Sequence, residues 1–210
     1  MNKIEYIKKY YRLFDYIFWI DDDAFFMNIE KSLDEFLPEK DIFLSICSSP
    51  DYKKIHTFIS SGQFMLKCSE RGRKFIDAIQ EVDLLKVKKW WDDSLGYFTN
   101  GDQDAIVYLL KENSEFKDHF EKFHHKKFNS RAEEILKEGG VSNVFILHFT
   151  GTPVRKEEDY LKIQKFLKSS PSLVNASLTQ NYNLVKKKSN IYVRLYRYLK
   201  NKYLTIRDSP

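Results

Sequence analysis

Three consecutive aspartates, residues 21–23, directly follow an aromatic and β-branched run with the sequence YIFWI. Burying a charged group is costly, so carboxylates in this place indicate the end of a buried strand. Side chains of an extended chain alternate between its two sides, so Asp21 and Asp23 would share one side while Asp22 points away. Paired carboxylates are typical ligands of Mg²⁺ and Mn²⁺. We expect a divalent cation at Asp21 and Asp23; the alternative is a solvated turn.

A histidine occupies a similar place late in the chain. His148 lies near the end of the apolar run VFILHF, residues 144–149. Taken alone, it would more simply be a hydrogen-bonded core histidine. Beside the two aspartates, an imidazole would favour Mn²⁺ over Mg²⁺. The other histidines lie in polar, lysine-rich surroundings and are interpreted as surface residues: His56, His119, His124 and His125.

The elements that must position these groups alternate between strands and helices. Continuous apolar runs predict four strands, at residues 16–20, 42–47, 57–67 and 144–149. Helical spacing predicts helices at residues 3–13, after the N-cap Ser69, and near residues 100–102 onward. This alternation predicts an α/β fold with a mixed, mostly parallel sheet flanked by helices. In open α/β sheets, ligands gather at the carboxyl ends of the strands.

Two further segments could line such a site. Gly62 interrupts the 57–67 strand, and a glycine there lets a ligand or another backbone approach closely. The alternative for this segment is a strand bulge. Asp102 and Gln103 lie at the start of a predicted helix, where the simpler interpretation of Asp102 is a helix cap.

Four ordered motifs resemble those of a glycosyltransferase family. They are WIDDDAFF (19–26), SSGQFMLK (60–67), GDQDAIVYLL (101–110) and ILHFTGTP (146–153). Together they resemble the retaining galactosyl-, mannosyl- and xylosyltransferases of plants and fungi, and more distantly the bacterial lipooligosaccharide α-galactosyltransferases. The resemblance spans residues 16–153. It implies a GT-A fold that uses a nucleotide-diphosphate sugar and Mn²⁺, with Mg²⁺ as the alternative ion.

The resemblance also implies roles for individual residues. Asp21, Asp23 and His148 would hold the ion against the diphosphate. Asp102 would orient sugar hydroxyls. Gln103, which cannot act as a base, would steady oxocarbenium-like charge while the departing phosphate takes the acceptor's proton. The small residues of the second motif would line the donor sugar: Ser60, Ser61 and Gly62. Further candidates for substrate contact are Asp22, Gly151 and Arg155.

The sequence departs from the family pattern in two places. The family often carries a lysine after the histidine that meets the diphosphate. Here Thr152 and Pro153 occupy that stretch, and Arg155 or Lys156 is the candidate replacement. Few residues precede the first predicted strand, so we expect the GT-A fold to be truncated at its N-terminus, with a partial nucleotide-binding half.

Two alternative functions follow from these features. The expected truncation, with only part of the nucleotide-binding half at residues 1–50, favours a catalytically weak or inactive subunit that binds nucleotide sugars or glycans. The aspartates favour a metal-dependent phosphohydrolase that uses Asp102 and Asp104 together with the 21–23 cluster.

Composition and charge divide the chain into a body and a tail. At 42% hydrophobic and 16% aromatic, the 210-residue chain is too apolar to be disordered, and we expect residues 1–185 to form the catalytic domain. Residues 186–210 carry eight Lys and Arg against Asp208 alone, a balance of +7. This leaves 27 of the 35 basic and 29 of the 30 acidic residues in 1–185, a balance of −2. The basicity therefore belongs to the tail.

The basic tail, residues 186–210, has an apolar face with Lys and Arg shoulders at helical spacing, which suits an anionic membrane surface. The alternative is a solvated tail or a helix docked on the body. No recognisable nucleic-acid-reading motif accompanies it, so nucleic acid is not expected as a partner. The sequence shows no secretion signal and no spanning apolar run. We expect a cytoplasmic protein, peripheral on the inner face of the membrane, with a glycan or glycolipid acceptor and reduced thiols at Cys47 and Cys68.

Overall fold

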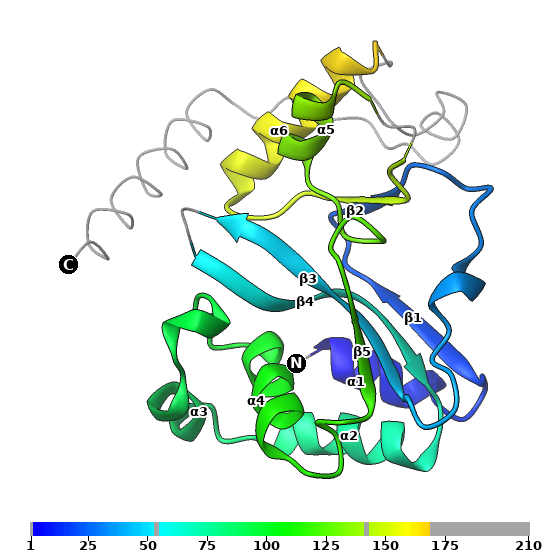
Figure 1. The fold of residues 1–210 in the computed structure, drawn as a ribbon, viewed down its shortest axis with the longest axis vertical. Coiled ribbons are helices and arrows are strands. Elements are labelled where there is room, and N and C mark those ends of the chain that lie inside the picture. The colour runs from blue at the N-terminus through cyan, green and yellow to red at the C-terminus, as the bar shows by residue number, and fades with distance from the viewer. Residues whose placement is uncertain (1, 53–54, 141–142, 169–210) are drawn as a thin grey trace. The chain divides into compact units, whose positions relative to one another are not determined.

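The computed structural model describes residues 2–52, 55–140 and 143–168 (Figure 1). The chain divides into two compact units, Met1–Thr150 and Gly151–Pro210. In the second unit the described part is residues 151–168, which contain helix α6 (Pro153–Phe166). The predicted basic tail and the boundary expected before it lie outside the described residues.

The first unit is built on a mixed four-stranded sheet with the strand order β1-β4-β3-β5. Its strands are β1 (Tyr16–Ile20), β3 (Leu44–Tyr52), β4 (Ile55–Lys67) and β5 (Phe120–Phe123). β4 pairs antiparallel with both β1 and β3, and β3 pairs parallel with β5. Two short strands, β2 (Ala24–Phe26) and β6 (Ile146–His148), pair antiparallel in a second sheet.

The α/β class and the mixed sheet flanked by helices are confirmed, but the prediction that the sheet is mostly parallel is wrong. Among the named strands of the described residues, β3 and β5 form the parallel pair. Only residues 53–54 separate β3 from β4, and so short a connection joins antiparallel neighbours. The predicted second strand ends at Cys47, whereas β3 continues through Pro50, where register shifts interrupt the ladder. A proline is compatible with a strand at such an irregularity.

The prediction that the first strand is buried on both faces is also wrong. All five side chains of β1 are half-buried because β1 lies at the edge of the sheet. They alternate between two cores: Ile17 and Trp19 pack against one, and Phe18 and Ile20 against the other.

Helices cover the face of the sheet to which Ile17 and Trp19 point (Figure 1). They are α1 (Asn2–Tyr10), α2 (Glu70–Glu81) and α4 (Asp102–Glu112), with α3 (Leu84–Trp90) and a 3₁₀ turn (Asp93–Leu95) between the last two. Their apolar stripes are fully buried against β3 and β4; Ile4 and Ile79 are both 0% exposed. Ser69 accepts a hydrogen bond from Gly72 N–H, as expected of an N-cap. This packing fixes the ends of α1 and α4 relative to the strands.

An aromatic core lies on the other face of the sheet. Phe36, in a 3₁₀ turn (Leu33–Phe36), packs with Phe128 and Phe145, and Cys47 and Ile146 complete the buried cluster. Ala24 of β2 packs against the same core, so the β2–β6 pair is held beside the main sheet. Helix α5 (Ala132–Glu138) completes the first unit. No helix in the described residues is both long and apolar enough to cross a bilayer.

Candidate metal and donor site

Asp21, Asp23 and His148 come together at the carboxyl end of β1. One ligand atom from each of the three side chains lies within 4.8 Å of the other two. His148 Nε2 lies 3.0 Å from Asp23 Oδ1. In the described part of the chain, this is the one such group of His, Cys, Asp and Glu side chains. The predicted convergence of the early aspartates and the late histidine is therefore present.

A turn, rather than an extended strand, brings the two aspartates together. Asp21 N–H donates to Gly62 O at 2.8 Å, which continues the β1–β4 ladder, and Ala24 N–H donates to Asp21 O at 3.1 Å, which closes the turn. The chain then enters β2, whose Ala24 pairs with His148 of β6. Phe149 N–H donates to Asp23 O at 2.9 Å. Backbone hydrogen bonds thus set the position of the histidine beside the aspartates. The expected alternation along an extended run is wrong, because Asp22 and Asp23 lie in this turn, where Asp22 is exposed.

The two oxygens of Asp21 have different surroundings. Oδ1 accepts a hydrogen bond from Trp19 Nε1 at 2.7 Å and lies 3.3 Å from Lys3 Nζ. Oδ2 faces the histidine across Gly62. Because Trp19 and Lys3 hold Oδ1, Oδ2 is the oxygen available to a cation shared with His148.

Gly62 leaves the space that the histidine uses. A Cβ atom at this position would lie 2.4 Å from His148 Cε1, 3.0 Å from His148 Nδ1 and 3.2 Å from Asp21 Oδ2. Real Cβ contacts are longer than this, so no residue larger than glycine fits without displacing the imidazole. The close approach that a glycine in a strand predicts is therefore an approach of His148.

His148 is 5% exposed and makes contacts through both ring nitrogens. Nδ1 lies 3.0 Å from the side-chain oxygen of Asn129, and Nε2 faces Asp23. Burial lowers the pKa of His148 below its ordinary value, and the hydrogen bond to Asp23 opposes this effect without cancelling it. This direction favours the neutral imidazole, which is the form that binds metals.

Lys3 joins three parts of the site and was not predicted from the sequence. Its ammonium lies 2.9 Å from Asp102 Oδ2 and 3.3 Å from Asp21 Oδ1, and it donates to Ser61 O at 2.7 Å. It also lies over the Trp19 ring, 5.5 Å from the centroid. The ammonium thus forms two ion pairs and one hydrogen bond within the site. A lysine in an amphipathic helix usually faces solvent, so the sequence carries no signal for this role.

Gln103 contacts segment 60–62 directly, and Asp102 is linked to it through Lys3. Gln103 Oε1 accepts a hydrogen bond from Ser61 N–H at 3.3 Å, and Gly62 N–H donates to Ser60 Oγ at 3.4 Å. The simpler interpretation of Asp102 as a helix cap is wrong. Asp104 caps α4, because its Oδ2 accepts hydrogen bonds from residues 99 and 101. Asp102 is thereby left to face Lys3.

Two of the predicted residues belong to the second unit, and one of the predicted surface histidines is buried. Gly151 and Arg155 belong to the second unit, where Arg155 lies 3.5 Å from Asp159 on α6. Among the histidines interpreted as surface residues, His125 is an exception. It is buried, and Nε2 contacts Glu134 of α5. Its backbone N–H donates to Ser48 Oγ at 3.2 Å, so it is held against β3 although its neighbours in the sequence are polar.

The geometry at Asp23 and His148 fits a divalent cation. Neighbouring ligands of an octahedral ion with bonds of about 2.1 Å lie about 3.0 Å apart. The distance between His148 Nε2 and Asp23 Oδ1 is 3.0 Å. Carboxylate oxygens with one imidazole nitrogen form a set that Mn²⁺ accepts well. Asp21, Asp23 and His148 are thus a group that could hold a metal ion.

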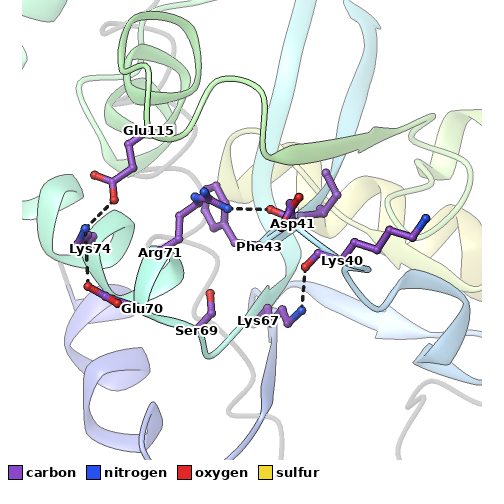
Figure 2. A pocket seen from close by; sticks show the side chains of 10 residues that line it. Lys40, Asp41, Phe43, Lys67, Ser69, Glu70, Arg71, Lys74 and Glu115 are labelled. Atoms are coloured by element: carbon purple, nitrogen blue, oxygen red, sulfur yellow. Dashed lines mark hydrogen bonds and ion pairs between the residues drawn. The ribbon is translucent and has the colours of Figure 1, made fainter.

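A cavity of about 380 Å³ lies elsewhere on the first unit, and Figure 2 shows its lining. Three of its cations are already paired with groups that line the cavity. Lys67 donates to Lys40 O, Arg71 donates to Asp41 O, and Lys74 forms an ion pair with Glu115. Asp21, Asp23 and His148 do not line this cavity, so we assign it no ligand.

No family model matches this sequence, and no curated protein matches it significantly. Among the solved structures that the chain resembles is one described as "crystal structure of a glycosyltransferase involved in the glycosylation of the major capsid of PBCV-1". The two chains are 13% identical with a TM-score of 0.49, over 74% of this chain and 70% of the other. A likeness at this level carries no argument about the activity of this chain.

Proposed function

We propose that the chain is a glycosyltransferase. It would move a hexose or pentose from a nucleotide-diphosphate sugar to a glycan or lipid-linked acceptor, with retention and with Mn²⁺. The observation that carries this proposal is the meeting of Asp21, Asp23 and His148 beside the Ser61–Gln103 contact. Four segments that resemble glycosyltransferase motifs, far apart in the sequence, contribute to one place. Chance motif matches would have no reason to converge.

The residues of this place suit glycosyl transfer. A divalent cation, when bound, would neutralise charge on the leaving diphosphate. The bond between the anomeric carbon and the phosphate oxygen breaks, and its electron pair leaves with the diphosphate. The acceptor oxygen bonds to the same face of the carbon, and its proton passes to the departing phosphate oxygen. Gln103 would steady the oxocarbenium-like charge, and Asp102, held by Lys3, would orient sugar hydroxyls.

The contacts of Asp104 count against the phosphohydrolase alternative. Asp104 is 0% exposed and its Oδ2 accepts three hydrogen bonds from residues 99–101. A carboxylate that completes the N-terminus of α4 is not free to turn toward a cation with Asp102. The alternative of an inactive binding subunit uses the same site, so binding and transfer must be measured separately.

The test combines calorimetry with an assay of transfer. A panel of nucleotide-diphosphate sugars is titrated into the full chain with and without Mn²⁺, and one donor should bind only with the ion. Transfer or donor hydrolysis is then followed by NMR, which reports the anomeric configuration. Asp23→Asn and His148→Ala should each lower turnover by about 10²-fold or more, because charge stabilisation in such sites is worth several kcal/mol.

Asp118→Asn is the matched control, since this exposed aspartate lies outside the site and should leave turnover unchanged. Wild-type turnover in Asp23→Asn would refute the proposal. Mn²⁺-dependent donor binding without turnover on any acceptor or water would favour the inactive binding subunit.

A further inference from the structure

Asn129 is buried against His148 and takes no part in the function described so far. It is 0% exposed, and its side-chain oxygen lies 3.0 Å from His148 Nδ1. The backbone holds the two residues in this relation. Ser130 N–H donates to Ile146 O at 3.0 Å, and His148 N–H donates to Ser130 O at 2.9 Å. The segment that carries Asn129 therefore runs along β6, on the side opposite β2.

The partners of Asn129 fix which way its amide points. Nδ2 donates to Ser48 O at 3.0 Å, and Oδ1 accepts a hydrogen bond from Arg131 Nη1. Arg131 is itself held, because Nη2 donates to Ser49 Oγ at 3.0 Å. A flipped amide would place its NH₂ group against the guanidinium and its oxygen against a carbonyl oxygen. The oxygen of Asn129 must therefore face His148.

The orientation of this amide determines which nitrogen of His148 carries the proton. An amide oxygen only accepts hydrogen bonds, so Nδ1 of His148 must be the N–H donor. In the neutral ring Nε2 then has a lone pair. That lone pair faces Asp23 Oδ1, 3.0 Å away, so Nε2 and the carboxylate oxygen can bind the same cation.

We propose that Asn129 is a positioning residue that fixes His148 in the Nδ1–H tautomer and directs Nε2 toward a cation shared with Asp23. The inference rests on the proposed function for the identity of the cation, but the tautomer itself does not depend on it. Groups that orient metal-binding histidines commonly contribute 10- to 100-fold to metal affinity.

The first test is the tautomer of wild-type His148 in the metal-free full chain. Long-range ¹H–¹⁵N NMR at pH 7.5 distinguishes a protonated ring nitrogen from one with a lone pair. We expect a protonated Nδ1, whether or not Nε2 also carries a proton toward Asp23 in the absence of the ion. An unprotonated Nδ1 would overturn the proposal whatever the enzyme does.

The second test is Mn²⁺ affinity, measured from the EPR signal of free Mn²⁺. Asn129→Leu removes the acceptor and should weaken binding by about 10- to 100-fold. Asn129→Asp keeps an acceptor for Nδ1 but replaces the donor to Ser48 O by an oxygen, so its affinity should fall less than that of Asn129→Leu. Asn28→Leu is the control, because this exposed asparagine accepts only from Glu30 N–H in its own turn and should not change the affinity.

The outcomes separate this inference from the proposed function. Equal losses of affinity in Asn129→Leu and Asn129→Asp, or wild-type binding in a folded Asn129→Leu, would overturn the positioning role while His148→Ala still loses the ion. Absence of Mn²⁺ binding to the wild type would instead refute the proposed metal dependence, and the tautomer would still be decided by NMR. If Asn129→Leu does not fold, Asn129→Asp and the wild-type spectrum decide.

Discussion

At the scale of single residues, Gly62 sets the space of the site. Its missing side chain is where the His148 ring lies, and a Cβ would come within 2.4 Å of Cε1. Gly62→Ala must push the buried imidazole away from Asp21 and Asp23. We expect the Mn²⁺ affinity to fall by about 10- to 100-fold, as when groups that orient a ligand are lost. Calorimetric titration of Mn²⁺ into the folded variant measures this.

A second glycine provides the control for this substitution. A Cβ at Gly140 would meet nothing within 4 Å, so Gly140→Ala should bind Mn²⁺ like the wild type. An unchanged affinity in folded Gly62→Ala would show that the ion does not depend on the observed position of His148.

Lys3 adds a positive charge that the site must tolerate. It lies 3.3 Å from Asp21 and 2.9 Å from Asp102, and its side chain is 12% exposed. Lys3→Met keeps the apolar stem and removes the charge. Because like charges repel, the Mn²⁺ affinity should stay equal or increase a few-fold. The loss of a partner leaves Asp102 free to move, so turnover should fall by about tenfold. Titration with Mn²⁺ and turnover measurements on the same variant would show that the affinity is kept while the turnover falls.

Lys9→Met is the matched control on the same helix. Lys9 is exposed, and its ammonium lies over the Tyr10 ring, away from the aspartates. Lys9→Met should change neither the Mn²⁺ affinity nor the turnover. A large loss of Mn²⁺ affinity in Lys3→Met would mean that Lys3 supports the ligand geometry more than its charge opposes the ion.

At the scale of elements, the segment 60–67 of β4 pairs irregularly with β3 at the place where Gly62 interrupts the strand. Gly62 indicates either a close approach or a bulge, and the structure shows both. Ile46 pairs with Phe64, and its neighbour Cys47 pairs with Ser60, so β3 skips residues 61–63. β1 continues to pair with this segment as far as the Asp21–Gly62 hydrogen bond. The skipped residues are thereby presented to the site.

The sequence predicts elements better than the partners of those elements. Strands 16–20 and 57–67 and the two helices after Ser69 and Gly101 are confirmed nearly to their ends because their apolar periodicity is local. The direction of strand pairing is not local, since a continuous apolar run looks the same in parallel and antiparallel sheets. Asn129 and Lys3 were missed for the same reason, because their types carry no signal until the chain is folded.

Helix α5 provides a pH-dependent test of local stability. Glu134 accepts hydrogen bonds from His125 and from Arg131 N–H at the start of the helix. Burial favours the neutral acid, but these hydrogen bonds and nearby positive charges outweigh it, so the pKa of Glu134 lies below its ordinary value of 4.5. The charged carboxylate therefore stabilises the fold above pH 4.5. That stabilisation is lost as the pH falls through the lower, folded-state pKa.

Glu134→Gln should lower the free energy of unfolding by about 1.5–3 kcal/mol at pH 7, the range for a hydrogen bond to a charged group. The variant should also lose less stability than the wild type on acidification below pH 4.5. Urea denaturation at a series of pH values measures both effects. Glu133→Gln, at the exposed neighbour, should keep the wild-type pH dependence. If the wild type and Glu134→Gln lose the same stability below pH 4.5, Glu134 does not contribute to acid sensitivity as expected.

At the scale of the whole molecule, the site depends on segments from opposite ends of the first unit. Lys3 of α1 and His148 of β6 both contact aspartates that follow β1, and α4 supplies Asp102. Such a site forms only when the complete first unit is folded, so ions and donors that bind it should stabilise the whole unit. A lipid-linked acceptor would also need to reach this site from a membrane, and the basic tail is the segment that we expect to make that contact.

The last prediction concerns this tail, which lies outside the described residues. Its eight Lys and Arg against one Asp should bind vesicles that contain phosphatidylserine, and not vesicles of phosphatidylcholine alone. Each basic residue near an anionic surface is worth about 1 kcal/mol, so replacing Arg194, Arg197 and Lys200 by Gln should weaken partitioning of the full chain by about 100-fold. Binding should also weaken in 1 M salt, where the Debye length is about 3 Å.

A triple replacement in the first unit distinguishes membrane binding through the tail from binding through the overall charge of the chain. Lys86, Lys88 and Lys89 are exposed on α3, and changing all three to Gln removes the same charge from the first unit. Co-sedimentation of this control should match the wild type if the membrane contact belongs to the tail, because contributions decay within a Debye length of the surface. Equal weakening of both variants would show that the vesicles respond to overall charge and would remove the reason to place a lipid-linked acceptor at the tail.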